Sequence, residues 1–247
     1  MSTEINAEIN TEINTLKEFV AQSKNIVFFG GAGVSTESGI PDFRSVDGLY
    51  AQKYKFPPEV ILSRSFFTQN TNEFYQFYKN KLLHLDAQPN KAHKALASLE
   101  KAGKLKAVIT QNIDGLHQKA GSINVLELHG SIWRNSCLNC GTSLSIDAVT
   151  KAKSVPLCSC GGVIKPDVVL YEESLCDKIM ITAMDHIAHA DLLIIGGTSL
   201  GVYPAAGLLK VYNGPYLVLI NKSPTHMDDR ADLIIRENIG NALACFI

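Results

Sequence analysis

A short run of buried-strand residues followed by glycines constrains the fold of this chain more than any other feature. Residues 25–29 (Asn-Ile-Val-Phe-Phe) form the kind of apolar, β-forming run found in a parallel sheet covered on both faces. Gly30, Gly31 and Gly33 follow directly. Glycine lets the backbone turn sharply and present N–H groups to a phosphate at the start of a helix, where the helix dipole also favours an anion. The run predicts a nucleotide-binding turn, with a plain strand-to-helix turn as the alternative.

The glycines do not complete the dinucleotide fingerprint of dehydrogenases. Thr36 stands where the third glycine is required, and no strand ending in an acidic ribose-binding residue follows about 20 residues later. The chain instead continues with Asp42, Phe43 and Arg44 in a loop stiffened by glycine and proline. Loops on such scaffolds carry function, so we expect this loop to belong to the same site.

Strands and helices are predicted to alternate along the rest of the chain. The expected strands are residues 105–110, 124–128, 192–195, 216–220 and 232–235, and the expected helices are residues 1–22, 65–85 and 90–101. This alternation predicts an α/β fold with a doubly wound, Rossmann-like parallel sheet. Open α/β sheets bind ligands at the carboxyl ends of their strands. Polar residues stand at those ends: Gln111, Asn112, Asp114, His129, Gly197, Thr198, Ser199 and Asn221.

Two of these positions also have simpler interpretations. The segment Asn112-Ile113-Asp114-Gly115 suits a capped turn. A lone histidine such as His129 is usually structural, but at a strand end in a cofactor crevice it can act as a base near neutral pH. Their position in the fold favours a functional role for both.

Four of the six cysteines lie in one segment rich in turn residues, as Cys137-x-x-Cys140 and Cys158-x-Cys160. We predict a structural zinc site with four thiolate ligands, because disulfides are disfavoured in a chain without export signals. Cys176 and Cys245 are interpreted as buried thiols on helices.

Composition excludes some classes of function. The chain has 247 residues and a formal net charge of -1. No long run of lysine and arginine is present, so we expect no direct nucleic-acid binding. No apolar run approaches the ~20 residues of a membrane span, and the N-terminus is acidic rather than basic, so we expect a cytoplasmic protein.

Three motifs in register resemble the sirtuin family of NAD-dependent protein deacylases. They are residues 31–44 (Gly-Ala-Gly-Val-Ser-Thr-Glu-Ser-Gly-Ile-Pro-Asp-Phe-Arg), 110–117 (Thr-Gln-Asn-Ile-Asp-Gly-Leu-His) and 126–130 (Leu-Glu-Leu-His-Gly). The resemblance implies one catalytic domain over residues 1–247. Its large Rossmann-like part would comprise about 1–44, 86–133 and 174–247. A small module would comprise the helical segment 45–85 and the segment 134–173, which carries the zinc ribbon and a substrate strand.

The resemblance also assigns roles to residues. His129 would be the catalytic base, acting with Asn112, while Asp114 and the backbone beside Ile113 would hold the nicotinamide carboxamide and Gln111 the neighbouring ribose. Residues 164–173 are similar to the family's substrate strand, although the family commonly has glycine at Glu172. The implied NAD contacts are Gly31, Ala32, Gly33, Thr36, Asp42, Phe43, Arg44, Gln111, Asn112, Ile113, Asp114, His129, Gly197, Thr198, Ser199, Asn221, Lys222 and Ile239, and the implied substrate contacts are Val168, Val169, Leu170 and Tyr171.

The implied reaction consumes NAD. The acetyl-lysine oxygen attacks the ribose carbon as nicotinamide leaves, His129 takes a proton from the ribose hydroxyls, and the products are lysine and O-acetyl-ADP-ribose. Acetylated-lysine proteins or peptides are the expected partners, and the expected metal is structural zinc. Two alternatives stay open: mono-ADP-ribosyl transfer to a protein side chain, and a non-catalytic NAD sensor.

The acyl preference can be addressed from one helix. Family members that prefer succinyl or malonyl lysine carry a Tyr-x-x-Arg pair, and the resemblance places Tyr75 at the tyrosine but Tyr78 at the arginine. Lys79 is the nearest alternative cation but should face about 100° away around the helix. We therefore expect acidic acyl groups to be poor substrates.

Overall fold

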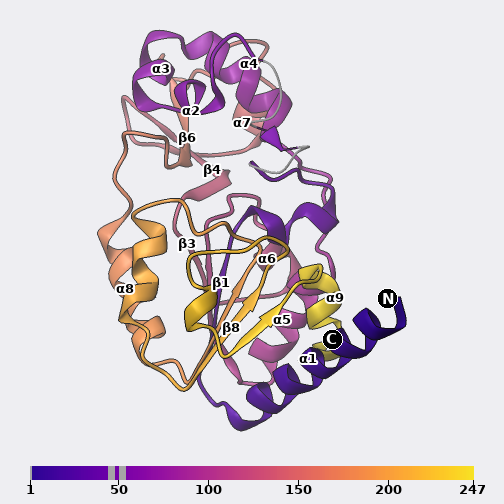
Figure 1. Cartoon of the computed structure of the whole chain (residues 1–247). Coiled ribbons are helices and arrows are strands. Elements are labelled where there is room, and N and C mark those ends of the chain that lie inside the picture. The colour runs from indigo at the N-terminus through magenta and orange to yellow at the C-terminus, as the bar shows by residue number, and fades with distance from the viewer. Residues whose placement is uncertain (1, 44–47, 50–53) are drawn as a thin grey trace.

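The fold is built on a six-stranded parallel sheet, seen at the centre of Figure 1. The computed structural model describes residues 2–43, 48–49 and 54–247. The strand order β3-β2-β1-β7-β8-β9 reverses between β1 and β7, as in a doubly wound sheet, which confirms the predicted fold class. The strands are β1 (Ile26–Gly30), β2 (Leu105–Thr110), β3 (Val125–Glu127), β7 (Leu192–Gly196), β8 (Tyr216–Ile220) and β9 (Leu233–Ile235).

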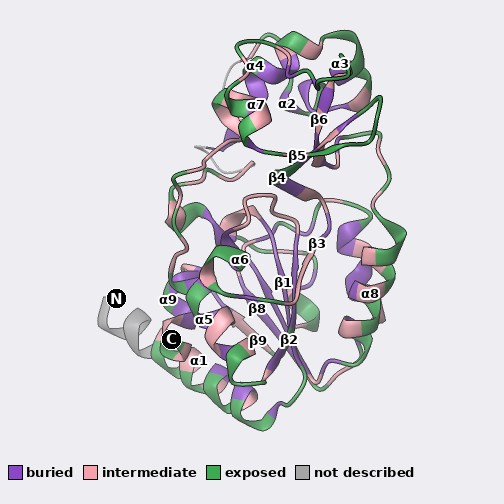
Figure 2. Cartoon of the chain, turned by 180° about the vertical axis from the view of Figure 1, so that it is seen from behind, coloured by how far each residue is buried: buried purple, intermediate pink, exposed green. Residues whose placement is uncertain are grey.

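The central strands are buried because helices cover both faces of the sheet. Every residue of β1 and β7 is buried, as the purple strands of Figure 2 show. One face packs on α1 (Ser2–Gln22), α5 (Lys91–Lys101) and α9 (Ile239–Leu243). The other packs on α8 (Asp177–Ala188) and the 3-10 helix η4 (Ala205–Val211). Apolar burial on both faces explains why these strands read as continuous apolar runs.

The two predicted helices at residues 1–22 and 90–101 are present. α1 buries Leu16 and Val20 against the sheet. α5 starts where the side chain of Asn90 accepts a hydrogen bond from Ala92 N at 2.9 Å, a normal N-cap. No helix in the described residues has both the length and the apolar character needed to cross a membrane.

The register of the sheet sets where its loops begin. Gly30 at the end of β1 pairs with Thr110 of β2 and with Gly196 of β7. Gly196 in turn pairs with Ile220 of β8. Four adjacent strands thus end at one level, so the loops that follow them meet at a single edge of the sheet.

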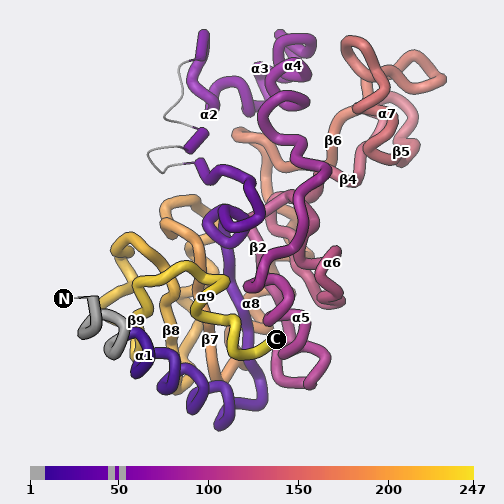
Figure 3. Tube along the Cα trace, turned by 90° about the vertical axis from the view of Figure 1, so that its right-hand side faces the viewer, coloured from indigo at the N-terminus to yellow at the C-terminus, as the bar shows by residue number. Residues whose placement is uncertain are grey.

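A smaller part lies above that edge in Figures 1 and 3. It contains an antiparallel sheet of order β5-β4-β6. Its hydrophobic cluster is distinct from the two cores that flank the large sheet. Its elements are α2 (Pro58–Ile61), α3 (Arg64–Gln69), α4 (Thr71–Lys81), β4 (Gly130–Cys137), β5 (Ser143–Ser145), α7 (Asp147–Thr150) and β6 (Ile164–Val168).

Two predictions for this part are wrong in detail. The single helix expected at residues 65–85 is divided into α3 and α4, because Asn70 leaves the helical region with φ -131° and ψ 46°. The strand expected at residues 164–173 ends at Val168. Beyond it, the carboxylate of Glu173 accepts the N–H of Leu170 at 2.8 Å, and this side-chain bond turns the chain out of the sheet.

Candidate functional site

A cavity of about 500 Å³ lies at the carboxyl ends of the central strands, where the loops of the large sheet meet the small part. This is the crevice at which open α/β sheets bind ligands. The structure brings most of the predicted site residues to its walls. They are Gly31, Ala32, Gly33, Asp42, Phe43, Gln111, Asn112, Ile113, Asp114, His129, Val168, Val169, Leu170, Tyr171, Gly197, Thr198, Ser199 and Asn221.

Three of the predicted NAD contacts are not on these walls. Thr36 is exposed, and its hydroxyl donates to the carbonyl of Gly33 at 3.0 Å. Ile239 is 4% exposed and packs in the core below the sheet, and Lys222 is exposed next to Asn221. Arg44 lies outside the described residues.

The glycine turn acts differently from the prediction. The N–H of Gly31 donates to Gly196 O at 3.3 Å and that of Gly33 donates to Gly197 O at 2.8 Å, so neither is a free phosphate donor. A Cβ at Gly33 would lie 2.7 Å from the Gly197 Cα. These glycines therefore let two loops touch. The expected helix is also replaced by two short 3-10 helices, η1 (Ala32–Val34) and η2 (Thr36–Ser38).

A hydrogen-bonded chain runs along one wall from Asn112 through Ser35 to Asp114. Ser35 Oγ donates to Asp114 Oδ2 at 2.6 Å, because a carboxylate can only accept. The same Oγ accepts from Asn112 Nδ2 at 3.1 Å, and Asp114 Oδ1 accepts from Leu116 N at 2.9 Å. The chain fixes the amide of Asn112 with its Nδ2 toward Ser35 and its Oδ1 turned away. It also holds a negative charge beside the cavity.

Gln111 connects three loops at the bottom of the site. Its Nε2 donates to Thr198 Oγ1 at 3.0 Å, and its backbone N–H donates to Gly30 O at 3.0 Å. Its carbonyl oxygen lies 2.9 Å from His129 Nδ1. The end of β1 and the loops after β2 and β7 are thereby joined to His129, two residues beyond β3.

The environment of His129 determines its protonation. A carbonyl oxygen can only accept, so Nδ1 carries the proton and Nε2 keeps its lone pair. Burial lowers the pKa of His129 below its ordinary value, and the hydrogen bond to Gln111 partly offsets this effect. The imidazole is therefore neutral at pH 7, with a basic nitrogen on a residue that lines the cavity.

His129 is held in place by the tight junction that follows it. Gly130 has φ 77° and starts β4, where a Cβ would lie 1.9 Å from Asp167 O of β6. The His129 carbonyl accepts the N–H of Val169 at 2.9 Å. The base and the predicted substrate segment are thus joined backbone to backbone.

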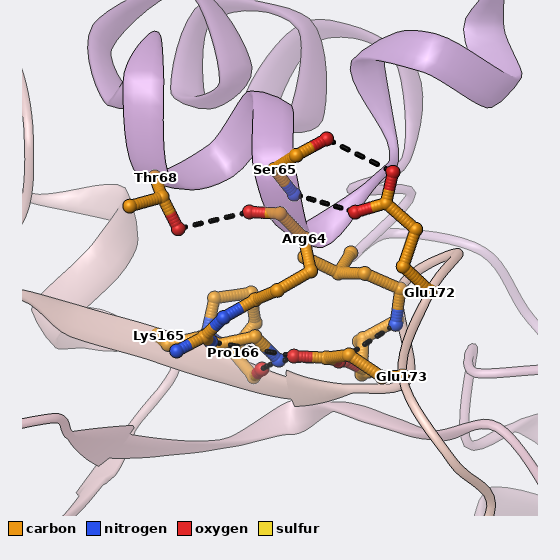
Figure 4. A network of polar contacts seen from close by, with 9 residues as sticks. Arg64, Ser65, Thr68, Lys165, Pro166, Glu172 and Glu173 are labelled. Carbon is orange, nitrogen blue, oxygen red and sulfur yellow. Dashed lines mark hydrogen bonds and ion pairs between the residues drawn. The ribbon is translucent and has the colours of Figure 1, made fainter.

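A polar network attaches the substrate segment to helix α3 (Figure 4). Glu173 accepts hydrogen bonds from Lys165 Nζ at 3.1 Å and Arg64 Nη1 at 3.3 Å. Glu172 accepts from Ser65 N at 2.8 Å and Ser65 Oγ at 2.9 Å. Glu172 also has φ 74°, a left-handed conformation that favours glycine. The two hydrogen bonds to Ser65 offset that strain, which explains how glutamate is tolerated where the resemblance implies glycine.

Sequence reasoning missed several residues of the site. Ser35 lies inside the first motif, so its place after the glycines was an available signal. Lys81 at the end of α4 and His84 just beyond it also line the cavity, although no pattern in the sequence indicated this. His93 of α5 is fully buried, and burial lowers its pKa to about 4.

The histidine His117, three residues after Asp114, is also buried. It is 1% exposed, packs against His93 with ring centroids 4.7 Å apart, and has a pKa lowered by burial. Neither ring lines the cavity. We assign the pair a structural part in the site.

The four predicted zinc ligands come together at the far end of the small sheet. The Sγ atoms of Cys137, Cys140, Cys158 and Cys160 all lie within 4.8 Å of one another. The Cys137–Cys160 distance is 3.5 Å and the Cys140–Cys158 distance is 3.8 Å. Tetrahedral zinc with Zn–S bonds of about 2.3 Å separates its sulfurs by about 3.8 Å, so the geometry fits zinc despite the short Cys158-x-Cys160 pair. Four thiolates would leave no open coordination position. Cys176 and Cys245, expected to be buried, are both exposed.

Removing one zinc ligand should destabilise the small part. We expect the wild type to hold one zinc per chain and Cys137→Ser to lose most of it. The variant should also melt at a lower temperature, because structural zinc contributes folding free energy. Metal analysis and calorimetry measure both effects. Cys245→Ser, which changes an exposed thiol outside the cluster, is the matched control. A wild-type protein that contains no zinc would contradict the assignment.

Removing the Ser35 hydroxyl should disturb the wall without changing its shape. Ser35→Ala leaves the partly buried Asp114 carboxylate without its 2.6 Å donor and frees the amide of Asn112 to rotate. We expect kcat/KM for nicotinamide release to fall about tenfold, the effect of one hydrogen bond to a charged group. Ser38→Ala, which changes a serine that does not line the cavity, should stay near the wild type. Equal losses in both variants would contradict the role of the chain.

Comparison with known proteins identifies the relatives of this chain. A model described as the Sir2 family matches residues 31–204. The NAD-dependent protein deacetylase of Clostridium acetobutylicum is 57% identical over 236 residues, covering 94% of this chain and 96% of that protein. The NAD-dependent protein deacetylase of Clostridium perfringens is 59% identical over 232 residues, covering 92% and 95%.

Solved structures that superpose on this chain are Sir2 structures as well. A Sir2 structure with a p53 peptide and NAD+ superposes with a TM-score of 0.83 at 38% identity, covering 93% of this chain and 94% of the other. A Sir2 structure with a deacetylated p53 peptide and 3'-O-acetyl ADP ribose has a TM-score of 0.86 at 38% identity, covering 94% and 95%.

Proposed function

This chain belongs to the Sir2 family, and we infer that it is an NAD-dependent protein lysine deacetylase. The reaction transfers the acetyl group of an acetylated lysine to the ADP-ribose part of NAD and releases nicotinamide. Relatives more than 50% identical over nearly the whole chain carry that name. Sir2 structures with NAD+ or with an acetylated ADP-ribose product support the same co-substrate and product.

The observation that carries the mechanism is the protonation state of His129. Its Nδ1–H is bonded to the Gln111 carbonyl, so Nε2 is a neutral acceptor on a residue of the cavity wall. Deacetylation requires a base that takes a proton from a ribose hydroxyl of the co-substrate. A positioned general base of this kind contributes about 10²- to 10⁴-fold to the rate. We assign that step to His129.

Asn112 and Asp114 supply the electrostatics of the same pocket. The nicotinamide of NAD is cationic, and positive charge develops on the ribose as it leaves. The fixed carboxylate of Asp114 and the Oδ1 of Asn112 put negative charge beside that position. Gln111 would contact the ribose, while Gly197, Thr198 and Ser199 would contact the phosphates. The segment from Val168 to Tyr171, which lines the cavity, would contact the peptide.

The remaining features form part of the same proposal. The division into a large part and a small module follows the boundaries given above from the resemblance. Acetylated proteins or peptides and NAD are the partners. The net charge of -1 supports a protein that does not bind nucleic acid. We propose that it acts in the cytoplasm.

Product analysis tests the function. The purified protein is incubated with NAD and an acetyl-lysine peptide, and the products are identified by mass spectrometry. We expect equal amounts of nicotinamide, deacetylated peptide and O-acetyl-ADP-ribose. Formation of ADP-ribosylated protein instead would favour mono-ADP-ribosyl transfer. Binding of NAD without any peptide-dependent nicotinamide release would favour an NAD sensor.

The base is tested by substitution and by pH. We expect His129→Ala to lower the turnover rate about 100-fold or more while NAD binding and folding persist. In the wild type, kcat/KM should fall with acid along a limb whose midpoint lies below pH 6.5, because burial lowers the pKa of His129. The limb should be absent from the variant.

A surface histidine supplies the control for this experiment. His226 is exposed and does not line the cavity, so His226→Ala should keep both the rate and the acid limb. Near-normal turnover by His129→Ala, or a wild-type limb centred above pH 6.5, would show that another group is the base.

The acyl preference gives a further prediction. Tyr78 provides no cation for a succinyl carboxylate, and Lys79 donates to the carbonyls of Ala152 and Ser154, away from the cavity, as expected. Lys81 does line the cavity, but an ammonium lacks the bidentate fork of arginine. On one peptide, we expect kcat/KM for succinyl-lysine to be at least about tenfold below that for acetyl-lysine. If the two kcat/KM values were equal in the wild type and Lys81→Met removed the activity on succinyl-lysine, Lys81 would be the missing cation.

A further inference from the structure

One polar side chain on the cavity wall has no partner in the described part of the chain. Tyr78 lies on α4 with 0% of its surface exposed, and its hydroxyl makes no hydrogen bond. A buried hydroxyl without a partner costs about 1–3 kcal/mol and requires an explanation. Tyr78 also lines the cavity, so a bound molecule can supply what the protein does not.

The ring of Tyr78 is held firmly. It stacks on Phe74 with centroids 5.6 Å apart and meets Tyr75 edge-on at 6.2 Å. Its orientation is therefore set by packing within the free protein. A hydroxyl on a fixed ring is a preorganised donor, which a ligand can use without an ordering cost.

The surroundings of Tyr78 are apolar. Leu49, Leu62, Val168 and Leu170 are buried, belong to the same hydrophobic cluster and line the same cavity. Burial raises the pKa of Tyr78 far above its ordinary value, with smaller effects from Tyr75 and Asp167. The hydroxyl therefore remains a neutral donor throughout the physiological pH range.

The neighbouring tyrosine shows that this situation is specific to Tyr78. Tyr75 is equally buried, but its hydroxyl donates to the carbonyl of Ile164, and it does not line the cavity. The hydroxyl of Tyr75 is satisfied within the protein, whereas that of Tyr78, on a residue that lines the cavity, is not.

We propose that Tyr78 is a specificity residue that donates a hydrogen bond to an oxygen in the distal part of a neutral acyl group, so that hydroxyacyl-lysine is a favoured substrate. The proposal rests on the proposed deacylase function. An acetyl methyl group has no acceptor for Tyr78. A hydroxyl on a longer chain has one, and it brings no charge into the apolar wall, whereas a succinyl carboxylate does.

The kinetic test uses acyl groups that differ by a single hydroxyl. We compare 3-hydroxybutyryl-lysine with butyryl-lysine, and lactyl-lysine with propionyl-lysine, on one peptide. For at least one pair, the ratio of kcat/KM values should fall about fivefold or more from the wild type to Tyr78→Phe, the effect of one lost hydrogen bond. Using the ratio removes any general effect of the substitution on activity. Tyr75→Phe, the same change three residues earlier, should leave the ratio within about twofold.

A second measurement tests the premise without substrate. Tyr78→Phe removes an unpaired hydroxyl and should raise the melting temperature by about 2–4 °C, while Tyr75→Phe removes a satisfied one and should lower it. A lower melting temperature for Tyr78→Phe would show that the hydroxyl already has a partner, and would overturn the proposal. Unchanged ratios for both substrate pairs would also overturn it. If the wild type fails to turn over acetyl-lysine, the deacetylase function itself is wrong, which is a different result.

Discussion

The backbones after β1 and β7 touch at Gly33 and Gly197, and the geometry of the site depends on that contact. The Gly33 N–H donates to Gly197 O at 2.8 Å, and a Cβ at either residue would collide with the other backbone. The contact is possible because Gly30 and Gly196 end their strands in register. Because the two loops are this close together, one crevice forms at the sheet edge. Gln111 lies at the bottom of this crevice and donates a hydrogen bond to Thr198.

Gln111 links this glycine contact to His129. It donates hydrogen bonds from its side-chain Nε2 to Thr198 and from its backbone N–H to Gly30 O, and its carbonyl holds His129. His129 then continues directly into β4, whose pairing with β6 starts at Gly130 and Val168. The base, the co-substrate crevice and the peptide edge therefore share one continuous backbone frame. A displacement at the glycine contact would change the distance between the base and both substrates.

Much of this was predictable from the sequence, for identifiable physical reasons. Strands β1, β7 and β8 are covered on both faces, so their sequences are continuous apolar runs with clear ends. The cysteine cluster was predictable because thiolate pairs at short spacing have few other uses in such a chain. Polar residues directly after strands were placed correctly because parallel strands end at a common edge.

Other features depend on contacts between distant segments, which local sequence does not encode. The engagement of the Gly31 and Gly33 amides depends on β7, about 160 residues away. The break at Asn70 gave little signal because the apolar spacing continues across it. The free hydroxyl of Tyr78 is distinguished from that of Tyr75 only by the position of Ile164.

The central claim is that His129 is a neutral base protonated at Nδ1. It is tested most directly by nitrogen NMR of the histidine-labelled protein as pH is varied, with the His129 signals assigned from their absence in His129→Asn. We predict an Nδ1-protonated ring whose titration midpoint lies below 6.5, because burial lowers the pKa and the Gln111 carbonyl accepts a hydrogen bond from Nδ1–H. A proton on Nε2 in the neutral ring, or a midpoint above 6.5, would contradict the account.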